Sequence, residues 1–243
     1  TIKSINLSNL CENTTRRYDF ANHNEVIFIN TGDVYNGEIL HNHYSKTTEL
    51  PGQAKKGIKK NDILISEIRP RNKRFAYVTD HADDYVVSTK FMVLQCKDDI
   101  NSKFIYHYLT SEDLLNIFQK EAEARSGTFP QITFDSIAHL KIKLPPKNEQ
   151  DKITNFLDLI DEKIQLNKKI NKTHEEFIQT IFKSWFVDFD PVRAKIEKKS
   201  TGLSKNLEDL FSDHFENSDL GEVPKNWKVE LFESVVDKYI DNR

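Results

Sequence analysis

Basic side chains are concentrated in one short part of this 243-residue chain, between residues 55 and 74. Eight lysines and arginines occur there beside two acidic residues, Asp62 and Glu67. The basic residues are Lys55, Lys56, Lys59, Lys60, Arg69, Arg71, Lys73 and Arg74. Because the whole chain has a formal net charge of −3, this local excess predicts a surface that binds a polyanion. A solvated loop is the alternative explanation.

Arginine and lysine would do different chemistry on such a surface. A guanidinium group can donate two hydrogen bonds to one guanine, whereas an ammonium group mainly neutralises phosphate. Arg69, Arg71 and Arg74 surround Pro70 on an expected turn between two strands, from which they could reach into a groove of DNA. These three arginines and Arg125 are the leading candidates for contact with bases or phosphates.

Two other polar segments could complete the surface. The first offers a cation, two hydroxyls and a glycine that the partner's backbone could approach closely, in Arg125, Ser126, Gly127 and Thr128. The second is a turn with donor and acceptor side chains that begins at Thr31 and includes Tyr35. Each segment alone would be an ordinary turn. Together, in a chain without a catalytic motif, they favour DNA recognition.

The sequence contains none of the catalytic motifs for which we searched. It contains no glycine-rich phosphate loop, no His-Glu-x-x-His, no Cys-x-x-Cys and no Gly-x-Ser-x-Gly motif. His41 and His43 could share one face of a strand, but such a lone pair is more often incidental than a metal site. Asp188 and Asp190 run from a helix into a connector, so they do not form a nuclease carboxylate pair. We expect no catalytic residue, no metal and no cofactor.

The sequence argues against a disulfide-rich, a membrane-spanning and a secreted protein. Cys11 and Cys96 are too few for a disulfide framework or a four-ligand zinc site. No apolar run approaches the roughly 18–20 residues that span a bilayer, and no signal-peptide pattern opens the chain. We therefore expect a cytoplasmic protein without a membrane partner.

The candidate residues lie within residues 1–147. The sequence of this part of the chain predicts short strands and one pair of helices. Strands are expected at Val26–Asn30, Ile63–Ile68, Phe75–Thr79, Tyr85–Ser88, Phe91–Gln95 and His139–Leu144. Ser102 is expected to cap a helix at Phe104–Thr110, and Ser111 one at Leu114–Ala124. Since strands and helices do not alternate regularly, these elements predict an α+β fold.

A single long helix is predicted next, because residues 148–186 contain neither glycine nor proline. At ~1.5 Å per residue such a helix would be roughly 58 Å long. A heptad seam with apolar ends and a polar middle runs along it through Ile153, Leu157, Ile160, Ile164, Asn167, Asn171, His174, Ile178, Ile181 and Trp185. A second apolar stripe follows Phe156, Leu159, Leu166, Ile170 and Phe177. The helix should pair with another helix and touch further neighbours; a core helix of its own domain is the alternative.

The remainder suggests the start of a second repeat. Residues 188–220 form a polar connector, and residues 229–237 share an apolar–acidic spacing with residues 5–12. We therefore expect four segments: a DNA-binding domain at 1–147, a spacer helix at 148–187, a connector at 188–220 and a truncated second domain at 221–243.

Several of these segments carry a family resemblance. The motifs are NTGDV at residues 30–34, KKNDILISEIRP at 59–70, GTFPQITFDSIAHLKIKLPP at 127–146, NEQDKITNFLDLIDEKIQLNKKIN at 148–171 and KSWFVDFDPV at 183–192. In this order they resemble the specificity subunit of type I restriction–modification enzymes. The resemblance covers nearly the whole chain; residues 145–153 and 183–192 are its most specific parts.

The resemblance implies a non-catalytic subunit that reads DNA. Such subunits carry two target-recognition domains, each followed by a long helix, and the two helices pair antiparallel as a ruler between the halves of a bipartite DNA site. Modification subunits, which bind S-adenosylmethionine and methylate adenine, dock on the helices, and a restriction subunit joins for cleavage. This chain would then need no cofactor of its own.

The chain departs from the family by holding one recognition domain and one helix. It is therefore either a fragment of a two-repeat subunit or a half-subunit that pairs with a second copy through the helix. A recognition domain of a single-chain restriction–modification enzyme is one alternative function, and a coiled-coil scaffold without a nucleic-acid role is another. The scaffold would leave the basic segment unexplained.

Overall fold

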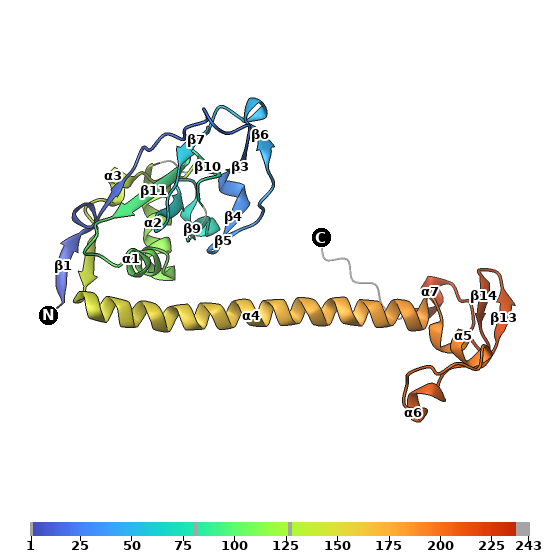
Figure 1. Ribbon diagram of the computed structural model, residues 1–243. Coiled ribbons are helices and arrows are strands. Elements are labelled where there is room, and N and C mark those ends of the chain that lie inside the picture. The colour runs from blue at the N-terminus through green and yellow to red at the C-terminus, as the bar shows by residue number, and fades with distance from the viewer. Residues whose placement is uncertain (1, 80–81, 126–127, 237–243) are drawn as a thin grey trace. The chain divides into compact units, whose positions relative to one another are not determined.

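The computed structural model describes residues 2–79, 82–125 and 128–236 (Figure 1). The chain divides into two compact units, Thr1–Asp161 and Glu162–Arg243. The boundary between them falls inside α4, the helix Lys147–Phe186. The division into four segments expected from the sequence remains a prediction.

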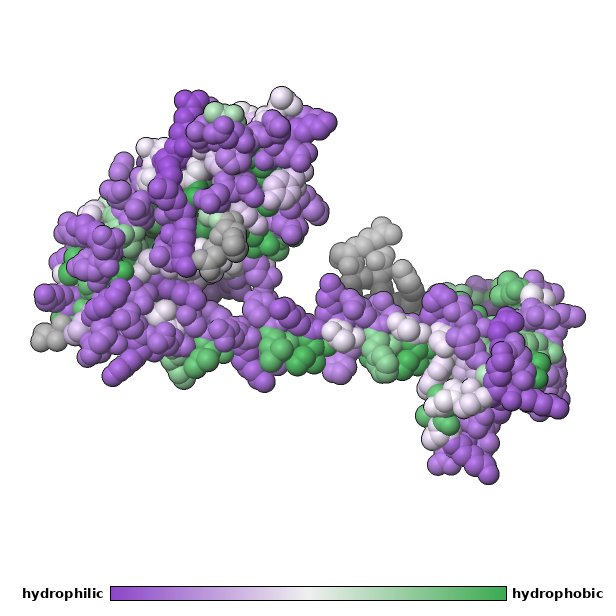
Figure 2. All heavy atoms as spheres, in the orientation of Figure 1, coloured by the Kyte–Doolittle hydropathy of each residue, from purple (hydrophilic) through white to green (hydrophobic). Residues whose placement is uncertain are grey.

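The long helix is present as α4, one continuous element of 40 residues. No glycine or proline interrupts its backbone hydrogen bonds, which is why it runs unbroken. Only Gln150 and Thr154 of α4 are buried, so it is not a core helix. Figure 2 shows apolar side chains in patches along α4. Much apolar surface on this helix is therefore left uncovered by the chain's described residues.

The central sheet of the first unit is antiparallel, in the order β2-β11-β8-β9. Its strands are β2 (Cys11–Asn13), β11 (Phe91–Cys96), β8 (Ile63–Ser66) and β9 (Phe75–Tyr77). All four residues of β8 are buried. Such a strand has packing partners on both faces of its sheet.

A second four-stranded sheet has the order β6-β3-β10-β7. Its strands are β6 (Ser45–Lys46), β3 (Glu25–Ile29), β10 (Tyr85–Ser88) and β7 (Ala54–Gly57). Strand β10 runs parallel to β3, and the other pairs are antiparallel.

Short elements complete the first unit. Two two-stranded ladders pair β1 (Lys3–Asn6) with β12 (Lys141–Leu144), and β4 (Val34–Tyr35) with β5 (Glu38–Ile39). The helices are α1 (Ser102–Leu109), α2 (Glu112–Arg125) and α3 (Phe134–Ile137). Four single 3-10 turns are η1 (Leu7–Asn9), η2 (Thr31–Asp33), η3 (Thr47–Glu49) and η4 (Pro70–Asn72). These elements confirm the mixed α+β fold class.

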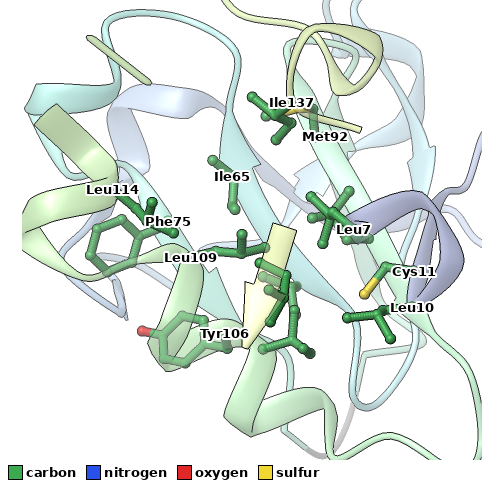
Figure 3. Packing of buried hydrophobic residues seen from close by; sticks show 14 of the residues in the cluster. Leu7, Leu10, Cys11, Ile65, Phe75, Met92, Tyr106, Leu109, Leu114 and Ile137 are labelled. Atoms are coloured by element: carbon green, nitrogen blue, oxygen red, sulfur yellow. The ribbon is translucent and has the colours of Figure 1, made fainter. Parts of the chain in front are cut away.

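The central sheet separates two hydrophobic clusters. On one face, Ile65 and Met92 pack with Leu109 of α1 and Leu114 of α2; Figure 3 shows these side chains pointing into one core. On the other face, the alternate residues Leu64 and Val93 of the same strands, with Phe91, pack with Ile27, Ile29 and Val87 of the second sheet. The period-two alternation of strand side chains thus gives this sheet a helical layer on one side and a sheet on the other.

The N-cap of α1 lies one residue before the expected one, and the helix begins two residues earlier than expected. Asn101, and not Ser102, is the N-cap, because its Oδ1 accepts a hydrogen bond from the backbone N–H of Phe104 at 3.0 Å. Ser102 is already helical, and its hydroxyl lies 2.8 Å from the hydroxyl of Tyr77. Two adjacent residues of capping type could not be distinguished from the sequence.

Up to residue 236, the second unit contains the end of α4, two helices, a hairpin and a further helical turn. These elements are α5 (Asp190–Ile196), α6 (Lys205–Glu208), β13 (Phe215–Ser218), β14 (Gly221–Pro224) and α7 (Phe232–Val235). Aromatic rings hold them together: Trp185 packs edge-on to Phe211 at 5.4 Å, and Phe189 to Trp227 at 5.4 Å. The expected polar connector is thus folded into short elements.

No helix in the described part of the chain combines the length and the apolarity that crossing a membrane would require.

Candidate nucleic-acid interface

The turn between β8 and β9 carries the central arginines. It is built around η4, with Arg69 before it and Lys73 after it, both in the left-handed backbone region (φ 45° and 54°). The backbone N–H of Ser66 donates to the carbonyl of Arg74 at 2.9 Å, which closes the hairpin below the turn. Arg69 and Arg71 are exposed at its tip, whereas Arg74 is half-buried.

One side of this turn lies against the segment that follows α2. The backbone N–H of Arg69 donates to the carbonyl of Pro130 at 3.1 Å, and the N–H of Ile132 donates to the carbonyl of Glu67 at 2.8 Å. The amide of Gln131 also donates to the Glu67 carboxylate at 2.8 Å. These bonds bring residues 130–132, which follow the second candidate segment, beside the arginine turn, although the two are about 60 residues apart in sequence.

Within this second segment, Arg125 is exposed at the end of α2, with its guanidinium 3.4 Å from the hydroxyl of Thr133. Thr128 is also exposed. The predicted residues Ser126 and Gly127 lie outside the described residues.

The third candidate segment, residues 31–37, adjoins the other side of the turn. Asn36 N–H donates to the carbonyl of Lys73 at 2.6 Å, and Gly37 N–H to that of Phe75 at 2.9 Å. Thr31 is buried, and its hydroxyl accepts from the Arg74 guanidinium at 3.4 Å. Thr31 therefore supports an arginine, while the ring of Tyr35 is 57% exposed. The structure thus brings residues 31–37 and 130–132 against the arginine turn.

Helix α2 supports the turn from below. The Lys73 ammonium lies 2.8 Å from the carboxylate of Glu112, and this hydrogen bond and charge raise the pKa of Lys73 above its ordinary value. The side-chain carbonyl of Gln119 accepts from the backbone N–H of Arg71 at 3.1 Å. The Arg71 side chain reaches Asn116 at 3.5 Å, a long contact that leaves it largely unrestrained.

The lysines before β8 do not join this surface. Strand β8 separates them from the arginine turn, because residues 59 and 60 precede it and the turn follows it. Lys59 N–H donates to buried Asp62 at 2.8 Å, and Asp62 forms a 2.7 Å ion pair with Arg16. Lys59 and Lys60 line a surface cavity of about 540 Å³. The basic residues of this segment, which we expected to form one cluster, therefore lie at separate places in the fold.

The remaining two lysines occupy β7. Lys55 is exposed. Lys56 is half-buried, and its ammonium donates to the carbonyl of Phe91 at 2.6 Å. Burial lowers the pKa of Lys56. Its charged end thus fixes β7 to the central sheet.

The first turns of α4 are attached to α1 within the first unit. The Gln150 side chain accepts from the backbone N–H of Asn101 at 3.0 Å and donates to the carbonyl of Pro145 at 2.9 Å. Further along, the Asp158 carboxylate lies 2.8 Å from the Lys103 ammonium. These contacts give the beginning of α4 a defined direction from the domain that precedes it.

Most seam positions of α4 are exposed. Ile153, Ile160, Ile164 and Ile178 are exposed, and Leu157, Ile181 and Trp185 are half-buried. The polar middle of the seam, Asn167, Asn171 and His174, is exposed as well. The second stripe is similarly open; Phe156 and Leu159 are both 64% exposed. An apolar face of this extent on a described helix has room for a partner.

Metal chemistry has no evident place on the described surface. The rings of His41 and His43 stack at 5.4 Å, and His41 lies 3.5 Å from Asp33. Within the described residues, no group of three histidine, cysteine, aspartate or glutamate side chains is arranged to hold a metal ion.

Residues 2–176 match the family model described as the type I restriction modification DNA specificity domain. The chain belongs to this family. The match includes nearly all of the first unit and continues along α4. It confirms the family resemblance drawn from the sequence.

Curated relatives agree with the assignment to the DNA specificity domain family. The chain is 49% identical over 209 residues to the type I restriction enzyme HindI specificity subunit of Haemophilus influenzae, covering 86% of this chain and 46% of that protein. It is 28% identical over 170 residues to the MjaIX specificity subunit of Methanocaldococcus jannaschii, covering 70% of this chain and 34% of that protein. The chain therefore spans less than half the length of these relatives.

Solved structures share the fold. The HsdS subunit from Thermoanaerobacter tengcongensis matches with a TM-score of 0.57 at 19% identity, over 81% of this chain and 49% of that one. A chain from a study of complex assembly and conformational transition of the type I restriction–modification system also matches with a TM-score of 0.57 at 19% identity, over 77% and 49%. At this identity the likeness concerns the fold.

Sequence reasoning missed the polar residues that organise the interface. Glu67 and Gln131 join two turns, Glu112 restrains Lys73, and Asp62 with Arg16 fixes the lysine-bearing loop. Glu67 and Asp62 were visible as the two acidic residues of a basic segment. Their partners lie 46 to 64 residues away, so no local pattern indicated them.

Proposed function

We propose that residues 1–147 recognise a specific DNA sequence, and that the chain acts as the non-catalytic reading part of a type I restriction–modification complex. The observation that carries this proposal is the convergence of residues 31–37, 67–74 and 130–132 on one surface. Within the described residues, Arg69, Arg71, Arg74 and Arg125 on this surface form no ion pair with a carboxylate. Their guanidinium groups therefore remain available to an anionic partner.

The positions of these cations suggest separate roles. Arg69 and Arg71 project from the exposed tip and would reach base edges in the major groove, where guanine accepts two hydrogen bonds. Arg74, which is half-buried, and Lys73, held by Glu112, have less freedom and would set the register on the phosphate backbone. Tyr35, Thr128 and Arg125 would border the duplex. Lys55, Lys59 and Lys60 would add phosphate contacts outside this surface, whereas the Lys56 ammonium is already bound to a carbonyl.

For α4 we propose pairing along the seam with a second helix of the same kind, from a second repeat or a second copy of the chain. The exposed seam and the separate second stripe support this, because one helix could cover the seam and leave the stripe to another protein. A modification subunit carrying S-adenosylmethionine is the proposed occupant of the stripe, and a restriction subunit the further partner. The assembly would work in the cytoplasm.

Selection from a random duplex library tests the DNA-reading proposal. The wild-type chain should enrich one sequence motif, and titrations with the selected duplex at fixed salt give its affinity. Replacing Arg69, Arg71, Arg74 and Arg125 together by alanine should abolish the preference for the motif. A variant that loses the same charge elsewhere, with alanine at Lys3, Lys46, Lys141 and Lys143, should retain it. Unchanged specific binding by the four-arginine variant would refute the surface assignment.

A further inference from the structure

The two cysteines of the chain lie directly opposite each other in the central sheet. Cys11 on β2 and Cys96 on β11 are register partners, and they are the only cysteines in the sequence. Their sulfur atoms are 2.7 Å apart, and both are free thiols. The two side chains thus face each other although their positions are 85 residues apart in sequence. The backbone would not have to change its path to bring them together.

The position of the pair in the ladder is the one where a disulfide fits best. In the neighbouring pair, Lys97 N–H donates to the carbonyl of Leu10 at 3.0 Å. Hydrogen-bonded and non-hydrogen-bonded pairs alternate in an antiparallel ladder, so Cys11 and Cys96 form a non-hydrogen-bonded pair, where side chains are closest. The Cα separation of such a pair, ~4.5 Å, falls within the range that a disulfide spans.

The two sulfurs differ in access. Cys11 is buried, whereas Cys96 is partly exposed, and both cysteines line a surface cavity of about 330 Å³ beside Glu12 and Lys97. The hydrogen bond with Cys96 and burial raise the pKa of Cys11 above its ordinary value, so Cys11 keeps its proton. A small oxidant therefore meets Cys96 first, with the protonated thiol of Cys11 behind it.

We propose that Cys11 and Cys96 form an oxidisable dithiol, which a peroxide converts into one intramolecular disulfide. In the first step the sulfur of Cys96 attacks a peroxide oxygen, the O–O bond breaks and water leaves, so that Cys96 becomes a sulfenic acid. In the second step Cys11 releases its proton as its sulfur attacks that of Cys96, the S–S bond forms, and the hydroxyl of the sulfenic acid leaves with that proton as a second water. Two thiols and one hydrogen peroxide thus give one disulfide and two waters.

The disulfide would close a loop across the first unit. It would join β2, which follows the amino-terminal strand, to the strand end that leads to Asn101 and the α4 attachment. Because the loop is long, the oxidised chain should resist unfolding better than the reduced one. The proposal of this disulfide does not depend on whether the arginine turn reads DNA.

Mass spectrometry after treatment with hydrogen peroxide tests the proposal. The wild-type chain should lose both free thiols together, lose the mass of two hydrogens, and give a peptide in which residues 11 and 96 are cross-linked. The unfolding midpoint should rise on the order of 10 °C, and dithiothreitol should reverse both changes. The Cys96→Ser variant should retain one unreacted thiol and show no rise.

Three results would overturn the proposal. These are thiols that persist under conditions that oxidise free cysteine, separate sulfinic acids without a cross-link, or disulfides between two chains only. The peptide measurement on the wild-type chain suffices to distinguish them if the serine variant folds poorly.

Discussion

The ammonium of Lys73 lies 2.8 Å from the carboxylate of Glu112, so a cation of the arginine turn is held by the first residue of α2. The partner raises the pKa of Lys73, which therefore stays charged throughout the neutral range. At the same time it cancels part of the positive charge that the turn presents. This contact therefore couples the stability of the turn to the positive charge available for the proposed binding of DNA.

Replacing Glu112 by glutamine should therefore strengthen binding to every duplex alike, because one negative charge leaves the interface. Replacing Lys73 by alanine should weaken all duplexes alike and reduce the slope of log affinity against log salt by about 1. Titrations at several salt concentrations measure both effects. A change in the preferred motif of either variant would show that this pair reads bases.

Replacing Arg69 by alanine should act on sequence preference. If Arg69 donates to a guanine, its loss should cost ~1–3 kcal/mol of binding free energy and relax one position of the selected motif. Lys55→Ala is the matched variant, since an exposed lysine away from the turn should affect all sequences equally. Equal loss across all sequences in the arginine variant would assign Arg69 to phosphate instead.

Glycine is required at position 37, where the candidate surface meets the core. Gly37 has φ +92°, and a Cβ added there would lie 2.8 Å from the hydroxyl oxygen of Tyr106. Gly37→Ala should therefore lower the free energy of unfolding by ~1–2 kcal/mol. A Cβ at Gly32 in the same segment meets nothing within 4 Å, so Gly32→Ala should be close to neutral. Chemical denaturation compares the two variants, and equal losses would contradict the packing of residues 31–37 described above.

The buried Asp62 should contribute to stability through Arg16. Asp62→Asn keeps the shape but removes the charge that Arg16 faces at 2.7 Å. Since the Arg16 side chain is 21% exposed, we expect a loss of about 2–3 kcal/mol, below the cost of a fully buried pair. Asp83→Asn, at an exposed position, should change the denaturation midpoint little. A similar midpoint for both variants would mean that the ion pair adds nothing.

Charges placed on the seam of α4 should separate the proposed helix partners. Ile160→Asp together with Ile164→Asp would put two carboxylates into an apolar interface and should abolish self-association or capture of a modification subunit. Lys163→Asp with Lys169→Asp introduces as many carboxylates on the exposed polar positions and should leave assembly intact. Analytical ultracentrifugation and pull-down provide the readouts. Assembly that survives the isoleucine changes would place the interface elsewhere on α4.

Local patterns predicted the elements well where one pattern dominated. The run at Tyr85–Ser88 became β10 with the same bounds, and the absence of glycine and proline after Asn148 gave a continuous helix. The family was also evident, because its motifs extend over long segments. In each of these cases the information is carried by neighbouring residues.

Relationships across long sequence separations could not be predicted in this way. The basic segment looked like one cluster, yet β8 separates Lys59 and Lys60 from the arginine turn, and Lys55 and Lys56 lie on β7. The contact of Arg69 with Pro130 and the opposition of Cys11 and Cys96 depend on sheet register. Register follows from the packing of the whole domain.

Photo-cross-linking from single positions shows which surface of the first unit contacts DNA. A photoreactive residue placed at position 71, on the tip of the turn, or at position 35, on the neighbouring segment, should cross-link to the selected duplex. The same residue at position 46 or 143, away from the turn, should not. Cross-links from positions 46 and 143 with none from 71 and 35 would contradict the assignment of the arginine turn and its neighbours as the surface that reads DNA.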